Sequence, residues 1–421
     1  MNIKKVNIAI IGQGYVGLPL AIEFGKKYPT LGFDINANRI DELNKGIDHT
    51  NEASLEQLRS ADQLTFSANI NDIKECNIYI VTVPSPVDEF KTPDLNPLKH
   101  ASKMIGEILK KGDTVIYEST VYPGCTEEFC VPLLKQASGL IFNTDFYCGY
   151  SPERINPGDK LNTLATITKV TSGSTPQIAN FVDELYSSII TAGTFKAASM
   201  KVAEASKAIE NAQRDVNISF INELALIFDR VGIDTQDVLD AAGTKWNFLK
   251  YKPGLVGGHC ISVDPYYLAY KAESLGYYPE VILSGRRVND NMSTFVANKM
   301  IKMLIKAGKQ IKDSKVLILG ITFKENCPDI RNSKIADVYN ELKEFGSNVD
   351  IYDCEADPNK VNQEYGIILI DEIKEKYDGI LLAVSHMKFS RINIKSLKKD
   401  SNSIVYDLKG FLPRNIVDSR L

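Results

Sequence analysis

The chain has 421 residues, 44% of them apolar and 24% charged, with a formal net charge of −4. This balance is typical of a globular protein with several cores, and it argues against a nucleic-acid binder that relies on bulk positive charge. The seven cysteines form no Cys-x-x-Cys pair and the four histidines no ligand-spaced pair, so neither a disulfide framework nor a metal site is predicted. Without a disulfide framework, a reducing cytoplasm is the expected location. No membrane span is predicted, since no stretch holds about 18 uninterrupted apolar residues.

The first part of the chain alternates strand-like and helical segments. Continuous apolar runs predict parallel strands that are covered on both faces. These runs lie at residues 6–11, 31–34, 77–83 and 114–118, and a helix is predicted at 18–27. The order is typical of a doubly wound α/β domain.

A single long helix is predicted at residues 198–231, which contain neither Gly nor Pro. Its apolar residues keep helical spacing, and the usual rise per residue gives a length of about 45–50 Å. Such a helix connects domains or packs against a partner subunit. More helical sequence follows, to about residue 307.

A second α/β series begins at residues 315–320, and its later strands are predicted at 349–352, 379–384 and 404–407. The expected fold class is therefore α/β, with two Rossmann-like doubly wound domains joined by a helical middle domain. We place the three domains at residues 1–198, 199–312 and 313–421.

The pattern Gly12-Gln13-Gly14-Tyr15-Val16-Gly17 follows the first predicted strand and opens a helix. Its glycines permit a tight turn, close backbone approach to a pyrophosphate and close helix–strand packing, and the helix N-terminus directs N–H groups at phosphates. Asp34 follows the first glycine by 22 residues, where a carboxylate accepts hydrogen bonds from the adenosine ribose and repels a 2′-phosphate. NAD is therefore predicted over NADP, although Arg39 nearby weakens that preference. Alternatively, the glycines only make a turn and Asp34 caps a helix.

Two further loops follow predicted strands, at residues 82–86 and 118–124. Ligands bind at the carboxyl ends of strands in open α/β sheets, so Thr82, Pro84 and Thr120 are candidate cofactor-binding residues. Thr120 is also suited to orient a water or a sugar hydroxyl. By itself, either segment is more often a plain loop.

Cys260 is the candidate nucleophile, because it follows a glycine-rich run and precedes Asp264 by four residues. If Cys260 begins a helix, the helix dipole lowers the thiol pKa, and Asp264 lies one turn away on the same face. A lone cysteine is by default a small buried hydrophobe, but the glycine run and Asp264 favour a reactive one. His259 is adjacent and does not face Cys260 on a helix, so it is structural or lines the substrate site.

Lys207 and Asn211 share one face of the long helix, in a polar stripe that Glu204 and Asp215 extend. The stripe is either a solvated face or, if it is buried, a cationic oxyanion site. Glu153, in a polar loop bracketed by prolines, is a candidate acid/base, with an exposed charge on a turn as the alternative.

Together these motifs resemble the UDP-glucose/UDP-N-acetylmannosamine dehydrogenase superfamily over nearly the whole chain, and residues 320–333 add a further match. The resemblance implies an N-terminal NAD domain, a long helix that forms a homodimer or larger homo-oligomer, and a C-terminal domain that holds UDP. It implies a four-electron oxidation of a sugar C6 hydroxyl with two NAD, through an aldehyde, a thiohemiacetal on Cys260 and a thioester.

The same resemblance assigns roles to individual residues. Lys207 and Asn211 would stabilise oxyanions, Asp264 and Thr120 would position a base or water, and Glu153 would assist hydrolysis. Lys324 and Arg331 would contact substrate or bridge domains. In full, the expected cofactor-binding residues are Gly12, Gly14, Tyr15, Val16, Gly17, Asp34, Arg39, Thr82, Pro84, Thr120 and Arg331. The expected substrate-binding residues are Glu153, Arg154, Lys207, Asn211, Tyr251, Gly257, His259, Arg286, Phe323 and Lys324.

Two departures from the glucose branch concern the sugar. This chain has Pro157 where a second glutamate is common, and Val263 where a lysine is common. The sequence around Cys260 is instead similar to the N-acetylhexosamine branch, in particular to the UDP-GlcNAc and UDP-GalNAc 6-dehydrogenases of capsule and O-antigen synthesis. UDP-N-acetylmannosamine or UDP-glucose is the alternative substrate.

Two other classes of function remain open on sequence alone. A two-electron hydroxyacid dehydrogenase of similar layout needs no cysteine. A non-catalytic nucleotide-binding regulator leaves Lys207, Asn211 and Cys260 without a purpose.

Overall fold

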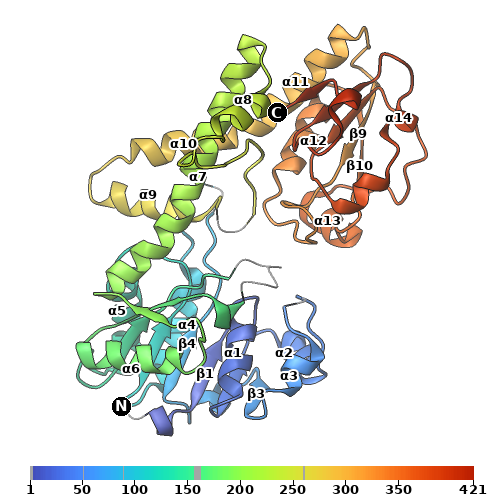
Figure 1. The fold of residues 1–421 in the computed structure, drawn as a ribbon. Coiled ribbons are helices and arrows are strands. Elements are labelled where there is room, and N and C mark those ends of the chain that lie inside the picture. Colours follow the sequence, from blue (N-terminus) through green and yellow to red (C-terminus); the bar gives the residue numbers. More distant parts are fainter. Residues whose placement is uncertain (1–2, 51, 89, 156–162, 259–260) are drawn as a thin grey trace. The chain divides into compact units, whose positions relative to one another are not determined.

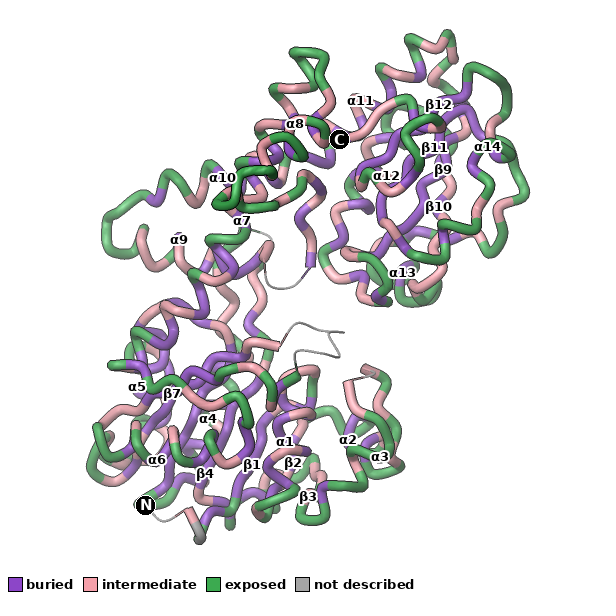
Figure 2. Tube along the Cα trace, viewed as in Figure 1, coloured by how far each residue is buried: buried purple, intermediate pink, exposed green. Residues whose placement is uncertain are grey.

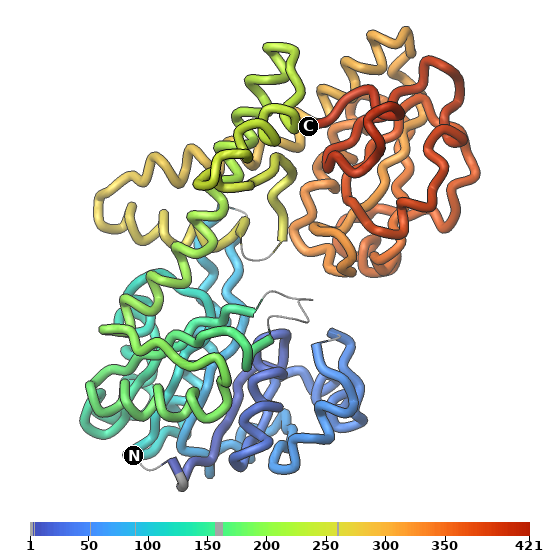
Figure 3. Tube along the Cα trace, in the orientation of Figure 1, coloured from blue at the N-terminus to red at the C-terminus, as the bar shows by residue number. Residues whose placement is uncertain are grey.

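The structure, a computed structural model, describes residues 3–50, 52–88, 90–155, 163–258 and 261–421. The chain divides into two compact units. The first comprises Met1–Glu210 with Tyr266–Tyr277, and the second comprises Asn211–Pro265 with Tyr278–Leu421. Each unit contains one sheet (Figure 1), and each sheet is built from one continuous part of the chain, as the colours in Figure 3 show.

The sheet of the first unit has eight strands in the order β3-β2-β1-β4-β5-β6-β7-β8. Its strands are β1 (Ile8–Ile11), β2 (Thr30–Phe33), β3 (Leu64–Ser67), β4 (Ile78–Val81), β5 (Thr114–Tyr117), β6 (Tyr147–Tyr150), β7 (Lys169–Gly173) and β8 (Thr194–Lys196). All neighbouring strands are parallel except β6 and β7. The four predicted strands are confirmed as β1, β2, β4 and β5, and the strand order reverses between β1 and β4, where such sheets bind their ligands.

Helices cover this sheet. They are α1 (Gly17–Gly25), α2 (Ala37–Asn44), α3 (Leu55–Arg59), α4 (Asn96–Ile108), α5 (Val131–Ser138) and α6 (Pro176–Ser187), with a π-helical turn at Thr126–Cys130 before α5. Strands β1, β4 and β5 are buried at every position. Figure 2 draws the buried trace near the labels β1 and β4 in purple. Burial on both faces explains why these strands are continuous apolar runs rather than alternating ones.

Helix α7 (Met200–Val231) runs unbroken for 32 residues, which confirms the predicted long helix and corresponds to about 48 Å. The boundary between the two units falls within it. Apolar side chains remain exposed along one side, among them Val202 at 48%, Ile209 at 54% and Phe220 at 57%.

Four more helices follow, namely α8 (Thr235–Ala242), α9 (Asp264–Ser274), α10 (Glu280–Asp290) and α11 (Met292–Lys306). Most of α9 belongs to the first unit, although it comes after a long stretch of the second. It is held there by a hydrogen bond from the Tyr267 hydroxyl to the Pro86 oxygen at 3.2 Å and by an ion pair of 2.6 Å between Lys271 and Glu128.

The second sheet is parallel throughout, in the order β10-β9-β11-β12-β13. Its elements are β9 (Lys315–Leu319), β10 (Asn348–Tyr352), β11 (Gly379–Leu382), β12 (Ile404–Asp407) and β13 (Ser419–Arg420), with helices α12 (Lys334–Glu344), α13 (Pro358–Tyr365) and α14 (Ile394–Leu397). Successive residues of β9 enter different cores: Val316 and Ile318 pack with α11 and α12, whereas Leu317 and Leu319 pack on the opposite face. All four strands predicted for this series are confirmed.

Short 3₁₀ turns occur at Ile3–Lys5, Ile70–Ile73, Leu164–Thr166, Met387–Arg391 and Arg414–Ile416. Within the described ranges, no helix is both long enough and apolar enough to cross a membrane.

Candidate active site

The glycine-rich loop joins β1 to α1 in the first unit. Gly12 has φ of +98°, a conformation that L side chains rarely adopt, and a Cβ on Gly17 would collide with the Gly12 oxygen. A Cβ on Gly14 would meet nothing within 4 Å, so this glycine faces open space. The first turn of α1 has no side-chain cap, and its Leu18 and Leu20 N–H groups donate to the Gly14 and Val16 oxygens at 3.0 and 3.4 Å. The loop therefore fits the pyrophosphate of a dinucleotide.

Asp34 follows β2 and lies beside this loop. Its two carboxylate oxygens accept hydrogen bonds from the backbone N–H groups of Gln13 at 2.8 Å and Asn36 at 2.9 Å. These bonds hold the carboxylate at the place where a ribose is expected. Ile35, the next residue, is 85% exposed, a free apolar surface suited to the adenine ring. Ile35 was not predicted from the sequence, although an apolar residue directly after the strand-end carboxylate is a signal for it.

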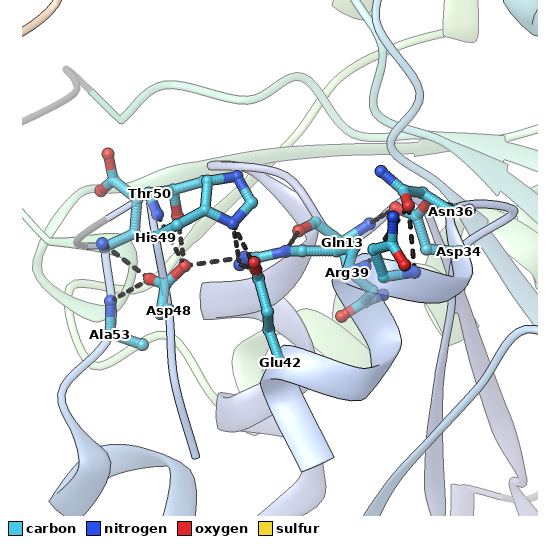
Figure 4. A network of polar contacts seen from close by, with 11 residues as sticks. Gln13, Asp34, Asn36, Arg39, Glu42, Asp48, His49, Thr50 and Ala53 are labelled. Carbon is cyan, nitrogen blue, oxygen red and sulfur yellow. Dashed lines mark hydrogen bonds and ion pairs between the residues drawn. The ribbon is translucent and has the colours of Figure 1, made fainter. Parts of the chain in front are cut away.

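Arg39 lies on α2 (Figure 4). Its Nε donates to the Gln13 oxygen at 2.9 Å, and its Nη2 forms an ion pair of 2.8 Å with Asp48. The guanidinium, predicted to bind the cofactor, is thus buried in protein contacts beneath the glycine-rich loop.

Thr82 and Thr120 belong to loops at the carboxyl ends of β4 and β5. The Thr82 hydroxyl lies 2.9 Å from the Gly12 oxygen, to which it donates, so it fixes the glycine-rich loop. Ser119 donates to the Val83 oxygen at 2.6 Å and thereby ties the loop that carries Pro84 to the one that carries Thr120. The structure brings these predicted residues to the same sheet edge as the glycines.

Glu204 fixes the other end of the Thr120 loop. This fully buried carboxylate of α7 accepts hydrogen bonds from the N–H groups of Gly124 and, at 2.9 Å, Thr126. Burial raises the pKa of Glu204 to about 7, against the effect of these bonds. The polar stripe on α7 is therefore not a solvated face at this position.

Glu153 lies in a buried charge cluster that the sequence did not reveal. Lys169, at the start of β7, forms ion pairs with Glu118 at 2.6 Å and with Glu153 at 3.5 Å, and the Tyr186 hydroxyl donates to Glu118. Burial raises the pKa of Glu118; burial also opposes the charge of Lys169, but the two carboxylates outweigh it and raise the pKa of that lysine. Glu153 is therefore a buried, oriented carboxylate rather than an exposed charge on a turn.

Arg154 points elsewhere. Its guanidinium donates to the Thr168 oxygen at 2.8 Å and forms an ion pair of 2.8 Å with Glu210. Both contacts lie within the first unit and leave the arginine about one-third exposed.

Lys207 is buried on α7, with 7% of its surface exposed. Across the described residues it makes no hydrogen bond or ion pair. A buried ammonium group without an anion is costly, and a group of this kind is typically retained for a ligand or a reaction.

Asn211 and Asp264 meet in the second unit. The Asn211 amide donates to the Asp264 carboxylate at 2.5 Å, and Arg214 donates to the Asn211 oxygen at 3.0 Å. Asp264 is buried and is the first residue of α9. The described helix thus begins four residues after Cys260; Cys260 and His259 lie outside the described residues.

The glycines before Cys260 pack against the loop after β9. A Cβ on Gly257 would come within 2.5 Å of the Asn332 oxygen, and Gly258 has φ of +84° with the Phe323 ring about 3 Å from its ideal Cβ position. Asn332 also donates to the Gly258 oxygen at 3.2 Å. The structure therefore brings Gly257 and Phe323 together, while their roles in substrate binding stay predictions.

The remaining predicted residues of this loop have defined partners. The Lys324 ammonium lies 5.5 Å from the centre of the Phe323 ring, and Arg331 forms a two-pronged pair with Asp329, at 2.9 and 2.5 Å. His386 stabilises the loop after β9, since its Nδ1 accepts a hydrogen bond from the Asn326 N–H at 2.9 Å.

Asp353 stabilises the same loop together with His386. Although burial opposes ionisation, hydrogen bonds from His386 and the Ile321 N–H lower the pKa of Asp353 to about 2. Asp353, His386 and Cys354 place ligand-type atoms within 4.8 Å of one another. Because both ring nitrogens of His386 already have protein partners, we interpret the group as structural.

Lys409, after β12, is a further cation that sequence analysis missed. Its Nζ lies 3.7 Å from the position of a Cβ on Gly254, and burial lowers the pKa of this lysine. A lysine at the carboxyl end of a Rossmann strand is the signal that sequence offered.

Tyr251 and Arg286 lie in different surroundings. Tyr251 lines a cavity of about 360 Å³ together with residues of α8. Arg286 is buried and pairs with Asp215 at 2.6 Å and Asp290 at 2.5 Å, so its charge is neutralised inside the second unit.

The chain is similar to known proteins along its whole length. Three profiles of the UDP-glucose/GDP-mannose dehydrogenase family match it: the NAD binding domain at residues 6–190, the central domain at 201–291 and the UDP binding domain at 317–414. The chain is 57% identical to a UDP-N-acetyl-D-glucosamine 6-dehydrogenase of Salmonella typhi, over 100% of both chains. It is 55% identical to one of Pseudomonas aeruginosa, over 99% of this chain and 100% of that one. The solved structure of a UDP-D-ManNAc dehydrogenase from Pyrococcus horikoshii matches with a TM-score of 0.88 and 29% identity, over 98% of both chains.

Proposed function

The chain belongs to the UDP-glucose/GDP-mannose dehydrogenase family, and on that premise we propose that it oxidises the C6 hydroxyl of a UDP-N-acetylhexosamine to a carboxylate. Family membership makes it an NAD-dependent UDP-sugar dehydrogenase, which sets aside the hydroxyacid dehydrogenase and the regulator. The observation that carries the catalytic part of the proposal is Lys207, a buried cation that pairs with no anion among the described residues and lies one helical turn from Asn211.

The cofactor site is formed by the first unit. The glycine-rich loop would hold the pyrophosphate and Asp34 the adenosine ribose, with Ile35 against the adenine. NAD, when bound, accepts the hydride that leaves the sugar carbon in each of two oxidation steps. Thr120 would hold the reacting hydroxyl or the hydrolytic water at the sheet edge.

Cys260 is the proposed nucleophile. After the first oxidation, its thiolate would add to the C6 aldehyde and give a thiohemiacetal, which the second oxidation converts to a thioester. Water would then cleave the thioester, which releases the uronate and returns the thiol. Such covalent catalysis divides one difficult oxidation into steps that a positioned nucleophile makes easier.

Three groups would assist this sequence. Lys207 would stabilise the oxyanion that forms at C6, and Asn211 would join it as an amide donor. Asp264, already hydrogen-bonded to Asn211, would orient that amide. Glu153, held by Lys169, would accept a proton from the hydrolytic water.

The sugar is proposed to be UDP-GlcNAc or UDP-GalNAc. Pro157 and Val263 depart from the glucose branch, and the two relatives at 57% and 55% identity are named for UDP-N-acetyl-D-glucosamine. UDP-N-acetylmannosamine is the second candidate, favoured by the solved relative at 29% identity. Lys324 and Lys409 would face the diphosphate of the substrate. Both follow strands of the second sheet, ligands bind at the carboxyl ends of such strands, and a diphosphate attracts cations.

We further propose that the enzyme is a cytoplasmic homodimer or larger homo-oligomer that serves surface-polysaccharide synthesis. Exposed Val202, Ile209 and Phe220 on α7 support packing against a second copy. A relative from Staphylococcus aureus that is 52% identical is called Protein CapL, which supports a role in capsule formation.

NADH release against UDP-Glc, UDP-GlcNAc, UDP-GalNAc and UDP-ManNAc tests the proposal, with the product mass as a second readout. We expect two NADH per sugar and a uronate of an N-acetylhexosamine. Cys260→Ser is expected to abolish uronate formation; uronate at the wild-type rate would refute the covalent route. NADH release from UDP-Glc alone would refute the proposed sugar.

A further inference from the structure

A buried arginine lies beside the ribose end of the dinucleotide site. Arg39 is in the first turn of α2, five residues after Asp34, and only 4% of it is exposed. In a Rossmann domain, an arginine near this carboxylate is what accommodates the 2′-phosphate of NADP. The chain nevertheless carries an NAD-binding domain, so something must keep this cation from a phosphate.

Asp48 provides that restraint. The Arg39 Nη2 donates to Asp48 at 2.8 Å, and the Asp48 side chain has no exposed surface. A charge-assisted bond between two buried groups is strong, and the guanidinium can leave it only by stranding a buried carboxylate.

The loop around Asp48 holds that carboxylate in place. Asp48 accepts hydrogen bonds from the backbone N–H groups of Thr50 at 3.0 Å, Glu52 at 2.9 Å and Ala53 at 2.9 Å. It also accepts one from the Thr50 hydroxyl at 2.6 Å. Figure 4 shows the contacts of Asp48 with Arg39, Thr50 and Ala53. Because these loop bonds hold the carboxylate, we expect it to stay in place if Arg39 moves.

A second carboxylate lies further out. The Arg39 Nη1 is 3.2 Å from His49 Nδ1, and His49 Nδ1 in turn lies 2.6 Å from the Glu42 carboxylate. A ring nitrogen that donates to Glu42 has no lone pair left for Arg39. Arg39 instead lies 3.9 Å from Glu42, so it is near one buried and one half-exposed carboxylate.

Arg39 is also tied to the cofactor loop itself. Its Nε donates to the Gln13 oxygen at 2.9 Å, while the Gln13 N–H donates to Asp34 at 2.8 Å. Asp34 and Arg39 are thus both hydrogen-bonded to the backbone of Gln13, Asp34 at its N–H and Arg39 at its carbonyl oxygen (Figure 4). The arginine shapes the glycine-rich loop from beneath rather than facing a ligand.

We propose that Asp48 is a specificity-determining residue for the cofactor: it holds Arg39 in an ion pair and so withholds the cation that a 2′-phosphate requires. Asp34 repels the 2′-phosphate, and Asp48 holds the Arg39 guanidinium that would otherwise bind it. With Arg39 paired, three carboxylates and one guanidinium surround this end of the site, a surplus of negative charge that disfavours a dianionic phosphate.

Dissociation constants for NADH and NADPH on the full-length protein, from nicotinamide fluorescence, test this inference. We expect Asp34→Asn to tighten NADPH binding about tenfold, and Asp48→Asn added to it to give about another tenfold, because Arg39 is released. Adding Arg39→Ala to that double variant should remove the second gain. If the double variant binds NADH and melts like Asp34→Asn alone but gains nothing for NADPH, the inference is overturned.

Because Asp48→Asn also weakens its loop, a second comparison keeps Asp48 intact. In the Asp34→Asn background, Arg39→Ala should then change NADH and NADPH affinity by the same factor. A selective loss of NADPH there would mean that Arg39 already reaches the phosphate, which overturns the restraint.

Glu42→Gln is the matched control, since it removes a charge from the same helix without breaking the buried pair. Its ratio of NADPH to NADH affinity should stay within about twofold of the wild type. A rise equal to that of Asp48→Asn would mean that bulk charge, and not the hold on Arg39, sets the preference.

Discussion

Lys169 and Lys207 are both buried in the first unit, at 2% and 7% exposure, but in the part of the chain that the structure describes only Lys169 has anionic partners. Lys169 sits between Glu118 and Glu153 at the start of β7. Lys207 faces no anion among the described residues. A buried charge with partners belongs to the architecture, whereas one without them costs stability and is kept for what it binds.

The largest expected effect is on the stability of the paired site. Lys169→Met leaves two buried carboxylates without a cation, and we expect it to lower the free energy of unfolding by about 3–5 kcal/mol. Urea unfolding followed by circular dichroism measures this. Adding Glu118→Gln should recover part of the loss; a single variant as stable as the wild type would mean that the pairing is not needed.

Lys207 should show the opposite behaviour. Lys207→Met is expected to lower kcat about 10²–10³-fold, the usual result of removing one oxyanion donor, while the melting temperature stays equal or rises. NADH production and thermal melting of the same preparation check both halves. Should activity survive while stability falls, Lys207 is structural and the contrast with Lys169 disappears.

Glu204 lies between these extremes, because it is buried with N–H partners and forms no ion pair within the described ranges. Burial raises its pKa to about 7 from an ordinary value of 4.5. A carboxyl whose folded-state pKa is raised contributes stability fully below the unfolded value and loses it as the pH rises through the folded one.

Wild-type stability should therefore fall by about 2 kcal/mol relative to Glu204→Gln between pH 4.5 and 7. Unfolding by urea at pH 5 and pH 8 measures the difference, with Glu128→Gln at a half-exposed position as the control. Parallel curves for wild type and Glu204→Gln would show that Glu204 does not titrate in this window.

Arg154 gives the smallest effect. Its pair with Glu210 is about one-third exposed on both sides, so solvent screens it. We expect Arg154→Ala to change the free energy of unfolding by less than about 1 kcal/mol. A loss comparable to that of Lys169→Met would show that exposure does not separate the two classes of pair.

The fold was largely predictable from the sequence, because parallel strands buried on both faces leave continuous apolar runs. Val316 to Leu319 illustrates this: alternate residues enter opposite cores, and all four are apolar. The long helix was equally predictable from the absence of Gly and Pro. Where domain boundaries fall between these elements stays a prediction.

The site was predictable only where a motif is local. The glycine-rich loop and Asp34 lie within one βαβ unit, so spacing alone indicates them. The buried pairing of Lys169 was not predicted, because a lysine at the start of a strand is usually exposed at the edge of the sheet. Its partner Glu118 also lies 51 residues away in the sequence. Arg39 was noticed, but its partner Asp48 was not, since an aspartate in a loop carries no signal of burial.

The docking of α9 on the first unit has a consequence for how the protein folds. The hydrogen bond from Tyr267 to Pro86 joins residues 181 positions apart in the sequence. Closing so long a loop costs conformational entropy that local contacts do not offset. We therefore expect α9 to dock late in folding. During synthesis the nucleotide-binding unit stays unfinished until residue 277 has left the ribosome, and the segment with Cys260 is made before that unit is complete.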